Sequence, residues 1–315
     1  MGMVPVSDQP NPSTRFYALA RALGPLVAIV IICGVAALAA AVVAVGLFLS
    51  APVRAKVGAA PDDFRAEQVT IASPSGATLS GWFVGGQPGS GVVVLMHGVW
   101  GNRLGMMRRA RLLGAAGFSI FLFDFQAHGE STGDRVTFGR LESLDAHAAV
   151  SYVRKRLPAE RVGVIGNSFG GAAALLGPTP LAVDALVLEG VYSDIGTAIA
   201  NRIHVALGPI VGGVVARPLA WLFELLLPPI LGFGPADLRP IDHIAEVTAP
   251  LLMASGTDDH RTTITEAVAM FERGREPKSF WPVEGAGHVD FEGYAPDEYR
   301  SRVVSFLIEK LRQPH

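Results

Sequence analysis

The stretch that decides the fold is RVGVIGNSFGGAAAL, residues 161–175. Its first part is a short apolar run with the length of a buried strand, and its last part, 172–175, consists of good helix formers. Between them lies GNSFG (166–170), a serine with glycines two residues before and two residues after it. A turn this tight needs such glycines, because larger side chains would collide with neighbouring backbone. The pattern predicts that Ser168 is held at a sharp strand-to-helix turn with its hydroxyl exposed above a sheet.

Apolar runs of strand length alternate with helical patterns on both sides of this turn. The alternation is typical of an α/β fold with a mainly parallel central sheet flanked by helices. Two further runs flank the turn residues 74–76 and predict an antiparallel hairpin. The expected strands are Glu67–Ser73, Ala77–Val84, Gly91–Met96, Ser119–Phe125, Arg161–Ile165, Ala185–Leu188, Leu251–Ala254 and Lys278–Val283. The expected helices are Arg103–Ala116, Phe138–Leu157, Thr263–Arg273 and Asp297–Arg312.

A serine nucleophile needs a base, and the base needs an acid that orients it. His288 follows the last expected strand in GAGH (285–288), where small neighbours let the imidazole project freely. The acid should follow an earlier strand, and SGTDD (255–259) offers both Asp258 and Asp259. The chain order of the candidates is therefore serine, aspartate, histidine.

A second pair of carboxylates stands on an expected helix. Glu142 and Asp145 are three residues apart, which could form an acid pair. The favoured interpretation is a solvated helix face, since charges at this spacing usually lie on the surface.

From about Glu67 to its end the chain resembles the α/β-hydrolase superfamily, in particular its bacterial serine hydrolases with short N-terminal membrane anchors. Five segments carry the likeness: LMHG (95–98), DFQAHGES (124–131), GNSFG (166–170), APLLMASGTDD (249–259) and GAGH (285–288). In the second segment Gln126 and Ala127 replace the family's usual Arg-Gly, a departure that concerns a structural loop. The resemblance implies the α/β-hydrolase fold and a serine nucleophile, and it leaves the substrate open.

The resemblance also implies roles for individual residues. Ser168 would be the nucleophile, and His288 would be the general base and then the general acid. The family's acid usually stands three residues after the glycine of its segment, which favours Asp259 over Asp258 as the residue that orients His288. The resemblance implies neither a metal nor an organic cofactor.

The oxyanion hole is expected from backbone N–H groups. By the same resemblance these would belong to Phe169, directly after the nucleophile, and to Val99, directly after the His97-Gly98 turn. Trp100 could line the acyl pocket, or it could be a surface-loop tryptophan, and the sequence leaves both interpretations open.

An apolar segment near the N-terminus predicts a membrane span. No formal charge occurs between Arg21 and Arg54, and Leu26–Leu49 is almost entirely Ala, Val, Ile and Leu. As a helix this stretch would be about 36 Å long, enough to cross a hydrocarbon core of roughly 30 Å. The apolar part of a cleaved signal peptide is only about 7–15 residues, so a single-pass anchor is favoured over cleavage near Pro52–Ala55.

The predicted organisation follows from that span. It comprises a tail (1–24), a transmembrane anchor (25–51), a polar linker (52–66) and an α/β-hydrolase domain (67–315). The expected location is a membrane, most simply the bacterial cell membrane. Arginines flank both ends of the span, so the side that carries the hydrolase domain is not predicted.

Composition excludes several other classes. Charged residues make up 17% of the chain, and 26 Lys and Arg against 28 Asp and Glu give a net charge of −2. Without a basic surplus, no nucleic-acid partner is expected. The single cysteine, Cys33, excludes an internal disulfide framework and any cysteine-based zinc site.

One segment departs from the α/β rhythm. Residues 196–238 follow an expected strand and are rich in Leu, Val, Ile, Gly and Pro, with few formal charges. In this superfamily a cap over the active site is commonly inserted at that point. The alternative is a second membrane-touching segment, although charges and prolines interrupt every window long enough to span.

Two classes of function remain open at this stage. The favoured one is a membrane-anchored serine hydrolase of carboxylic esters, thioesters or lipids, with a serine peptidase as a variant. The other is a catalytically silent protein of the same fold that binds apolar ligands. Three triad positions favour the enzyme, whose partners would be a small-molecule or lipid ester and the membrane.

Overall fold

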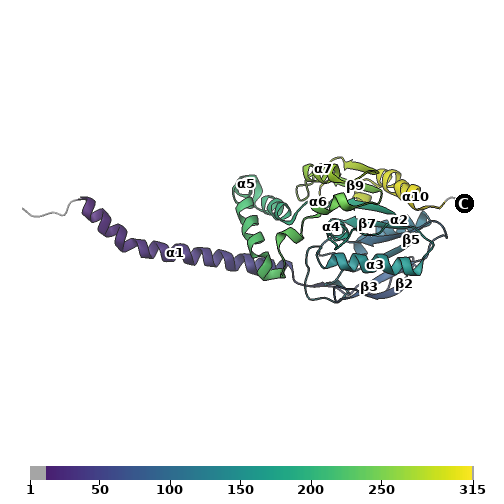
Figure 1. Ribbon diagram of the computed structural model, residues 1–315, viewed down its shortest axis with the longest axis horizontal. Coiled ribbons are helices and arrows are strands. Elements are labelled where there is room, and N and C mark those ends of the chain that lie inside the picture. Colours follow the sequence, from purple (N-terminus) through teal and green to yellow (C-terminus); the bar gives the residue numbers. More distant parts are fainter. Residues whose placement is uncertain (1–11, 314–315) are drawn as a thin grey trace, which may run out of the picture. The chain divides into compact units, whose positions relative to one another are not determined.

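A computed structural model describes residues 12–313, which form two compact units, 12–45 and 46–313. The first unit is most of helix α1 (Pro12–Leu49), and the second holds the end of α1 and everything after it (Figure 1). Within α1, Leu23–Leu49 has 27 residues with a mean hydropathy of 3.1, long and apolar enough to cross a membrane.

Helix α1 begins ahead of the predicted anchor. It starts at Pro12, within the predicted tail, and contains Pro25 in its interior. Residues 16–23 are mostly Ala, Leu and Arg, good helix formers that extend the helix ahead of the apolar part. Residues 1–11 of the predicted tail lie outside the described range.

The second unit is built on an eight-stranded sheet in the order β10-β9-β8-β7-β4-β5-β3-β2. All neighbours from β10 to β5 are parallel, and β3 pairs antiparallel with both β5 and β2. The strands are β2 (Glu67–Ala72), β3 (Thr78–Val84), β4 (Val92–Met96), β5 (Ser119–Phe123), β7 (Val162–Asn167), β8 (Ala185–Glu189), β9 (Leu251–Gly256) and β10 (Lys278–Val283). Each predicted strand is present, and the mainly parallel sheet is confirmed.

Helices cover both faces of the sheet, which explains why the central strands are apolar throughout. The helices after α1 are α2 (Met107–Ala115), α3 (Glu142–Arg156), α4 (Phe169–Leu175), α5 (Ile195–Leu231), α6 (Pro240–His243), α7 (Ile264–Arg273), α8 (Phe291–Tyr294), α9 (Pro296–Tyr299) and α10 (Ser305–Leu311). The short 3-10 segments are η1 (Arg103–Met106), η2 (Pro235–Asp237) and η3 (Ile244–Glu246), and η4 (Arg300–Val304) is a π-helical turn.

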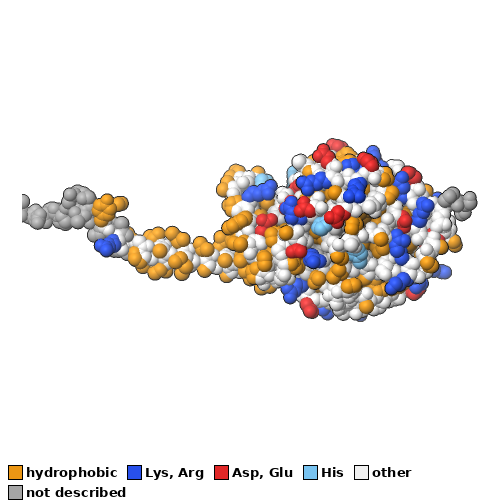
Figure 2. All heavy atoms as spheres, in the orientation of Figure 1, with side chains coloured by type: hydrophobic (Ala, Val, Ile, Leu, Met, Phe, Trp, Pro, Cys, Tyr) orange, Lys and Arg blue, Asp and Glu red, His pale blue; other side chains and the backbone are white. Residues whose placement is uncertain are grey.

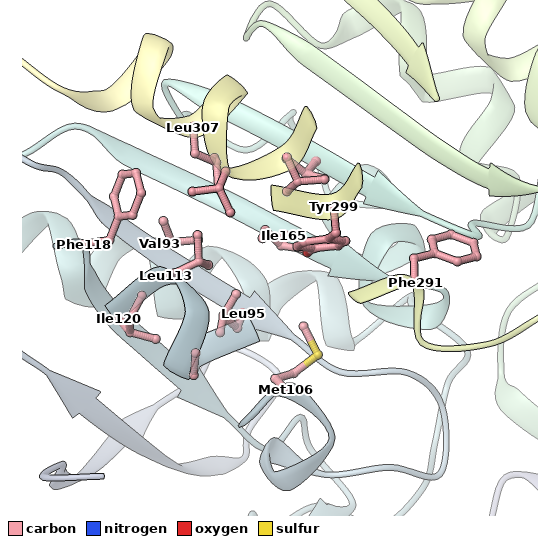
Figure 3. Close-up of a cluster of buried hydrophobic side chains, with 14 of the residues drawn as sticks. Val93, Leu95, Met106, Leu113, Phe118, Ile120, Ile165, Phe291, Tyr299 and Leu307 are labelled. Atoms are coloured by element: carbon pink, nitrogen blue, oxygen red, sulfur yellow. The ribbon is translucent and has the colours of Figure 1, made fainter. Parts of the chain in front are cut away.

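A large core cluster lies between one face of the sheet and helices α2, α9 and α10. Leu113 of α2 and Leu307 of α10 point toward Val93, Leu95 and Ile165 of the central strands (Figure 3). All five side chains are fully buried. This packing fixes the carboxyl ends of the parallel strands, where the predicted site residues stand.

The segment predicted as a polar linker, 52–66, is attached to the domain. Strand β1 (Val53–Arg54) pairs in parallel with β6 (His128–Gly129). The Val53 N–H donates to Ala127 O over 2.7 Å, and the Ala55 N–H donates to Gly129 O over 2.9 Å. The predicted polar linker is thus fixed to the domain at its start, because backbone groups left unpaired in the β6 loop bind the passing chain.

The predicted insertion at 196–238 is a helical hairpin. Helix α5 is interrupted at Gly208, whose φ of 75° is left-handed, and Pro209 follows it directly. Two arms result, 195–207 and 209–231, and η2 completes the insertion.

Candidate active site

Ser168 occupies the turn between β7 and α4 with φ 49° and ψ −110°. Positive φ is costly for a residue with a side chain, and it is tolerated where the surroundings enforce it. Here the Ser168 N–H donates to Glu189 O on the neighbouring strand over 2.7 Å, and Ser168 O accepts from Gly171 and Ala172. The serine is therefore held in this conformation from both sides of the turn.

The two glycines of the turn are explained by close approach of backbone. A Cβ on Gly166 would lie 2.5 Å from Gly171 Cα, and a Cβ on Gly170 would lie 2.5 Å from Met96 O. Both distances are shorter than any real contact, so β7, α4 and the end of β4 can pack this tightly only without side chains.

Replacing Gly170 by Ala is expected to lower the free energy of unfolding by about 1–3 kcal/mol, because the added methyl must displace the end of β4. Chemical denaturation of the detergent-solubilised protein measures this. Gly114→Ala is the matched control, since a Cβ there meets nothing within 4 Å. In a helix that change should stabilise by roughly 0.5–1 kcal/mol. Equal effects of both substitutions would contradict the packing argument.

The structure brings Ser168, His288 and Asp259 together in one chain of hydrogen bonds. His288 Nε2 lies 3.1 Å from Ser168 Oγ, and His288 Nδ1 lies 2.7 Å from Asp259 Oδ2. The three residues follow β7, β9 and β10, whose carboxyl ends meet at one edge of the sheet. Ser168 and Asp259 are buried, and His288 is partly exposed, as a base that must reach both nucleophile and substrate would be.

Asp259 is surrounded by donors. The N–H groups of Arg261 and Thr262 donate to its Oδ1 over 2.7 and 3.0 Å, and the Thr262 hydroxyl donates to Oδ2 over 2.6 Å. Burial alone would raise the pKa of Asp259, but the bond and charge of His288 and the bonds from Thr262 hold it below its usual value. Asp258, the alternative acid, is exposed. The geometry thus favours Asp259, which stays ionised at neutral pH.

The two backbone groups expected to form an oxyanion hole lie close to Ser168. Phe169 is the first residue of α4, so its N–H has no partner within the helix. The loop that carries Val99 passes beside the nucleophile, because a Cβ on Gly98 would lie 4.0 Å from Ser168 Cβ. Within residues 12–313 the Val99 N–H is paired with no acceptor. Both groups are available to a developing oxyanion.

Two buried histidines support this loop, and the sequence did not assign them a role. His97 Nε2 accepts from the Phe125 N–H, and His128 Nε2 accepts from the Trp100 N–H over 3.2 Å. Burial and the neighbouring His128 lower the pKa of His97 to about 3, and burial lowers the pKa of His128 as well. Both rings are therefore neutral at pH 7 and serve as fixed acceptors. The His-Gly pairs at 97–98 and 128–129 were the available signal.

Trp100 was one candidate for the lining of the acyl pocket, but its indole contacts the end of α1. Its indole N–H donates to Leu49 O over 3.1 Å, and the side chain is 45% exposed. This geometry favours the surface alternative, in which Trp100 fixes the end of α1.

A buried ion pair underlies the site beside His288. Arg109 Nη2 donates to Glu189 Oε2 over 2.5 Å, and the Tyr299 hydroxyl donates to Glu189 Oε1 over 2.6 Å. Burial alone would lower the pKa of Arg109, but the charges of Glu189, Tyr299 and Asp290 and the bond to Glu189 together raise that pKa. Arg109 and Glu189 border a pocket of about 200 Å³ that also touches His288 and Asp290. Glu189 directly follows the apolar run of β8, which was the only sequence signal for this group.

The interpretation of Glu142 and Asp145 as a solvated helix face is wrong. Both side chains are fully buried. Glu142 accepts from the Thr137 hydroxyl, and Asp145 accepts from the Ser73 hydroxyl over 2.6 Å. Burial raises the pKa of Asp145 to about 7 against the bonds it accepts. Glu142 binds the loop that directly precedes α3, and Asp145 binds the hairpin turn from a distant part of the chain.

Among residues 12–313 no group of three or more His, Cys, Asp or Glu side chains is arranged to hold a metal ion. The polar side chains at the site are instead bonded to one another, as the Ser168–His288–Asp259 chain shows.

Comparison with known proteins agrees with the fold. Residues 93–302 match the model of the alpha/beta hydrolase family. The chain is 26% identical over 262 residues to the uncharacterized protein YfhR of Escherichia coli K12, covering 80% of this chain and 84% of that protein. It is 22% identical over 241 residues to the uncharacterized protein YqkD of Bacillus subtilis, covering 75% and 77%.

Solved structures give the same result. An esterase from Pyrococcus furiosus superposes with a TM-score of 0.68 at 25% identity, covering 84% of this chain and 98% of that one. An esterase from Exiguobacterium antarcticum, at 18% identity and a TM-score of 0.57, covers 76% of this chain and 99% of its own. The second likeness concerns the fold alone.

Proposed function

This chain belongs to the alpha/beta hydrolase family and is a hydrolase, and we propose that it cleaves carboxylic esters, thioesters or lipids through an acyl-enzyme on Ser168. One observation carries the proposal: His288 lies within hydrogen-bond distance of both Ser168 Oγ and the buried Asp259 carboxylate. A strained serine with an oriented base is the arrangement that nucleophilic catalysis requires.

The reaction would proceed in two halves. Ser168 Oγ attacks the ester carbonyl while His288 Nε2 takes its proton, and Asp259 stabilises the resulting imidazolium through Nδ1–H. The oxyanion is held by the N–H groups of Val99 and Phe169. When the intermediate collapses, the carbon–oxygen or carbon–sulfur bond breaks, and His288 returns the proton to the leaving group. Water activated by His288 then attacks the acyl-enzyme and releases the acid and free Ser168.

The ester class is favoured by the Pyrococcus furiosus structure, which is described as an esterase and shares a quarter of its aligned residues with this chain. The site residues themselves are also compatible with ester cleavage, since they need no metal-bound water to attack a carbonyl.

A fluorophosphonate probe tests the proposal directly. It phosphonylates a serine only when that serine is activated by a base, so the full-length protein should be labelled and Ser168→Ala should not. Ser301→Ala, at an exposed serine that donates to Glu298 O, is the control and should label like the wild type. Absence of label on the folded wild-type protein would favour the catalytically silent alternative.

We further propose that Leu23–Leu49 anchors the enzyme as a single membrane span. Its length and mean hydropathy of 3.1 suit a span, and the residues that follow it are bonded to the domain through β1. Cleavage after Ala55 would remove those bonds.

The full-length protein is therefore expected in the membrane fraction after washing with high salt and carbonate, with an intact N-terminus by mass spectrometry. The physical reason is that withdrawing a 27-residue apolar helix from lipid would expose all of it to water. Recovery in the soluble fraction, with a new N-terminus near residue 56, would show a cleaved signal sequence instead.

A further inference from the structure

The two arms of α5 pack against each other through small residues. Ala200 of the first arm lies in one buried cluster with Ala216 and Ala220 of the second. A Cβ on Gly212 would lie only 2.7 Å from His204 Cα, so the backbones are in direct contact near the tip. The small residues of each arm are therefore buried between the two arms. Large apolar residues of the second arm lie on its outer side.

Both ends of the hairpin are attached to the domain at one place. The Ile195 N–H, at the start of α5, donates to Leu238 O over 3.0 Å, just after the hairpin returns. Although α5 is long and apolar enough to pass the criterion for a membrane span, it reverses direction at Gly208. It can therefore enter an apolar phase only as a hairpin whose two ends stay on the same side.

The outer face of the second arm is an exposed apolar stripe, which we define as Ile210, Val214, Trp221 and Leu225. The spacing of four, seven and four residues places them on one side of a helix. Their exposed fractions are 83%, 74%, 64% and 58%. Figure 2 shows hydrophobic side chains gathered over α5. Large apolar side chains exposed on one face of a helix in this way mark an interaction site.

The second arm carries two charged residues, Arg217 and Glu224. Glu224 is turned toward the first arm, since a Cβ on Gly196 would meet its Oε1 at 1.8 Å. Arg217 is exposed on the same face as the stripe, three residues after Val214 and four before Trp221. Arginine and tryptophan are the side chains that favour the boundary between lipid acyl chains and headgroups.

The last turn of α1, which belongs to the same unit as α5, identifies the phase that covers the stripe. A Cβ on Gly46 would lie 2.6 Å from Ile230 Cδ1, so this turn packs on the end of the second arm. Leu47 and Phe48 are 54% and 77% exposed beside it. The turn is fixed there, because Leu49 O accepts from the Trp100 indole and Ser50 O accepts from the Val136 N–H.

We propose that the stripe on α5 is buried in the same bilayer that holds the N-terminal span, at the level of the headgroups and upper acyl chains. The exposed Leu47 and Phe48 lie on the turn that packs on the end of the second arm, and the chain enters the membrane at that point. A bilayer therefore reaches this surface without any second protein. The inference rests on the anchoring of Leu23–Leu49, and it is independent of the catalytic role of Ser168.

The test uses full-length protein in phosphatidylcholine vesicles with an environment-sensitive nitrobenzoxadiazole label on a single cysteine. In a Cys33→Ala background, Ile210→Cys carries the label, and Val268→Cys on α7, 38% exposed, is the matched control. We expect lipids with nitroxide-bearing acyl chains to quench the label at 210 at least twofold more than the label at 268. Aqueous iodide should quench the label at 268 and spare the label at 210.

The native cysteine supplies the control for anchoring, since Cys33 lies within the span. Suppose that the lipid nitroxides quench the label on Cys33, while iodide quenches the label at 210 as strongly as the label at 268. That result would overturn the docking of α5 and leave the anchor intact. A label at 210 that neither quencher reaches would mean that protein covers the stripe, which also overturns it. A Cys33 label open to iodide would overturn the anchor and this inference together. Fluorophosphonate labelling of each variant, measured separately, reports on Ser168.

Discussion

Replacing Ser168 by Ala, or His288 by Ala, is expected to lower kcat for a soluble ester by on the order of 10⁶. The serine supplies the oxygen that bonds to the acyl group, and the histidine at 3.1 Å is placed to take its proton. Without either one the covalent route is closed, and only the oxyanion hole and substrate binding remain. Steady-state kinetics with a chromogenic ester, with the protein concentration fixed by absorbance, measure the loss.

The double variant is the sharper form of this experiment. If Ser168 and His288 act as one unit, Ser168→Ala combined with His288→Ala should cost no more than either change alone. His243→Ala, on α6 and away from the site, is the control and should keep kcat within about twofold. A His288→Ala enzyme that retained more than a hundredth of kcat would contradict the assignment of the base. His97 and His128 cannot replace it, since both are buried and neutral with their Nε2 atoms already accepting bonds.

The sheet could be predicted because its strands are short apolar runs that end in glycine-rich turns. A strand buried on both faces must be apolar along its whole length, so β4, β7 and β9 are recognisable without any alternation. The site could be predicted for a related reason. Parallel strands bring their carboxyl ends to one edge of the sheet, so polar residues directly after β7, β9 and β10 become neighbours in space.

Contacts between residues far apart in the chain could not be predicted in this way. Strand β1 is only two residues long and has no periodicity, and its partner lies more than seventy residues away. Buried Asp145 accepts from Ser73 and Ser75 of the hairpin turn and from the Gln126 N–H. The sequence around a carboxylate on a helix does not show whether distant residues will bind it. For this reason the interpretation of Glu142 and Asp145 as a solvated helix face is wrong.

The end of α1 shows the same limit. The composition of Leu23–Leu49 indicates a span whatever follows it, and Pro61-Asp62-Asp63 made the next segment resemble a linker. The attachment depends on the Trp100 indole and on backbone groups of the β6 loop, none of which is marked in the sequence of the segment they bind.

Asp259→Asn is expected to lower kcat by about 10⁴, less than the loss of Ser168 but far more than Asp258→Asn, which should change kcat by under about threefold. The reason lies in the proton on the imidazole. Asp259 Oδ2 accepts from His288 Nδ1–H and so leaves Nε2 unprotonated and able to accept from Ser168 Oγ. An amide at position 259 can turn its NH₂ toward Nδ1, which moves the ring proton to Nε2 and removes the base.

The hydrogen bonds around Asp259 determine which way the amide of an asparagine would turn at this position. Its other oxygen accepts from the N–H groups of Arg261 and Thr262, so the amide oxygen of an asparagine has a strong preference for that side and its NH₂ is left facing His288. The folded structure should survive, and denaturation midpoints of the Asp259→Asn and Asp258→Asn variants should agree within a few degrees. The check is kcat/KM for one ester across pH 6–9. Because the depressed pKa keeps the Asp259 carboxylate ionised over that whole range, titration of Asp259 should add no inflection to the wild-type profile. If Asp258→Asn proves the damaging change, the acid has been assigned one residue too far along the chain.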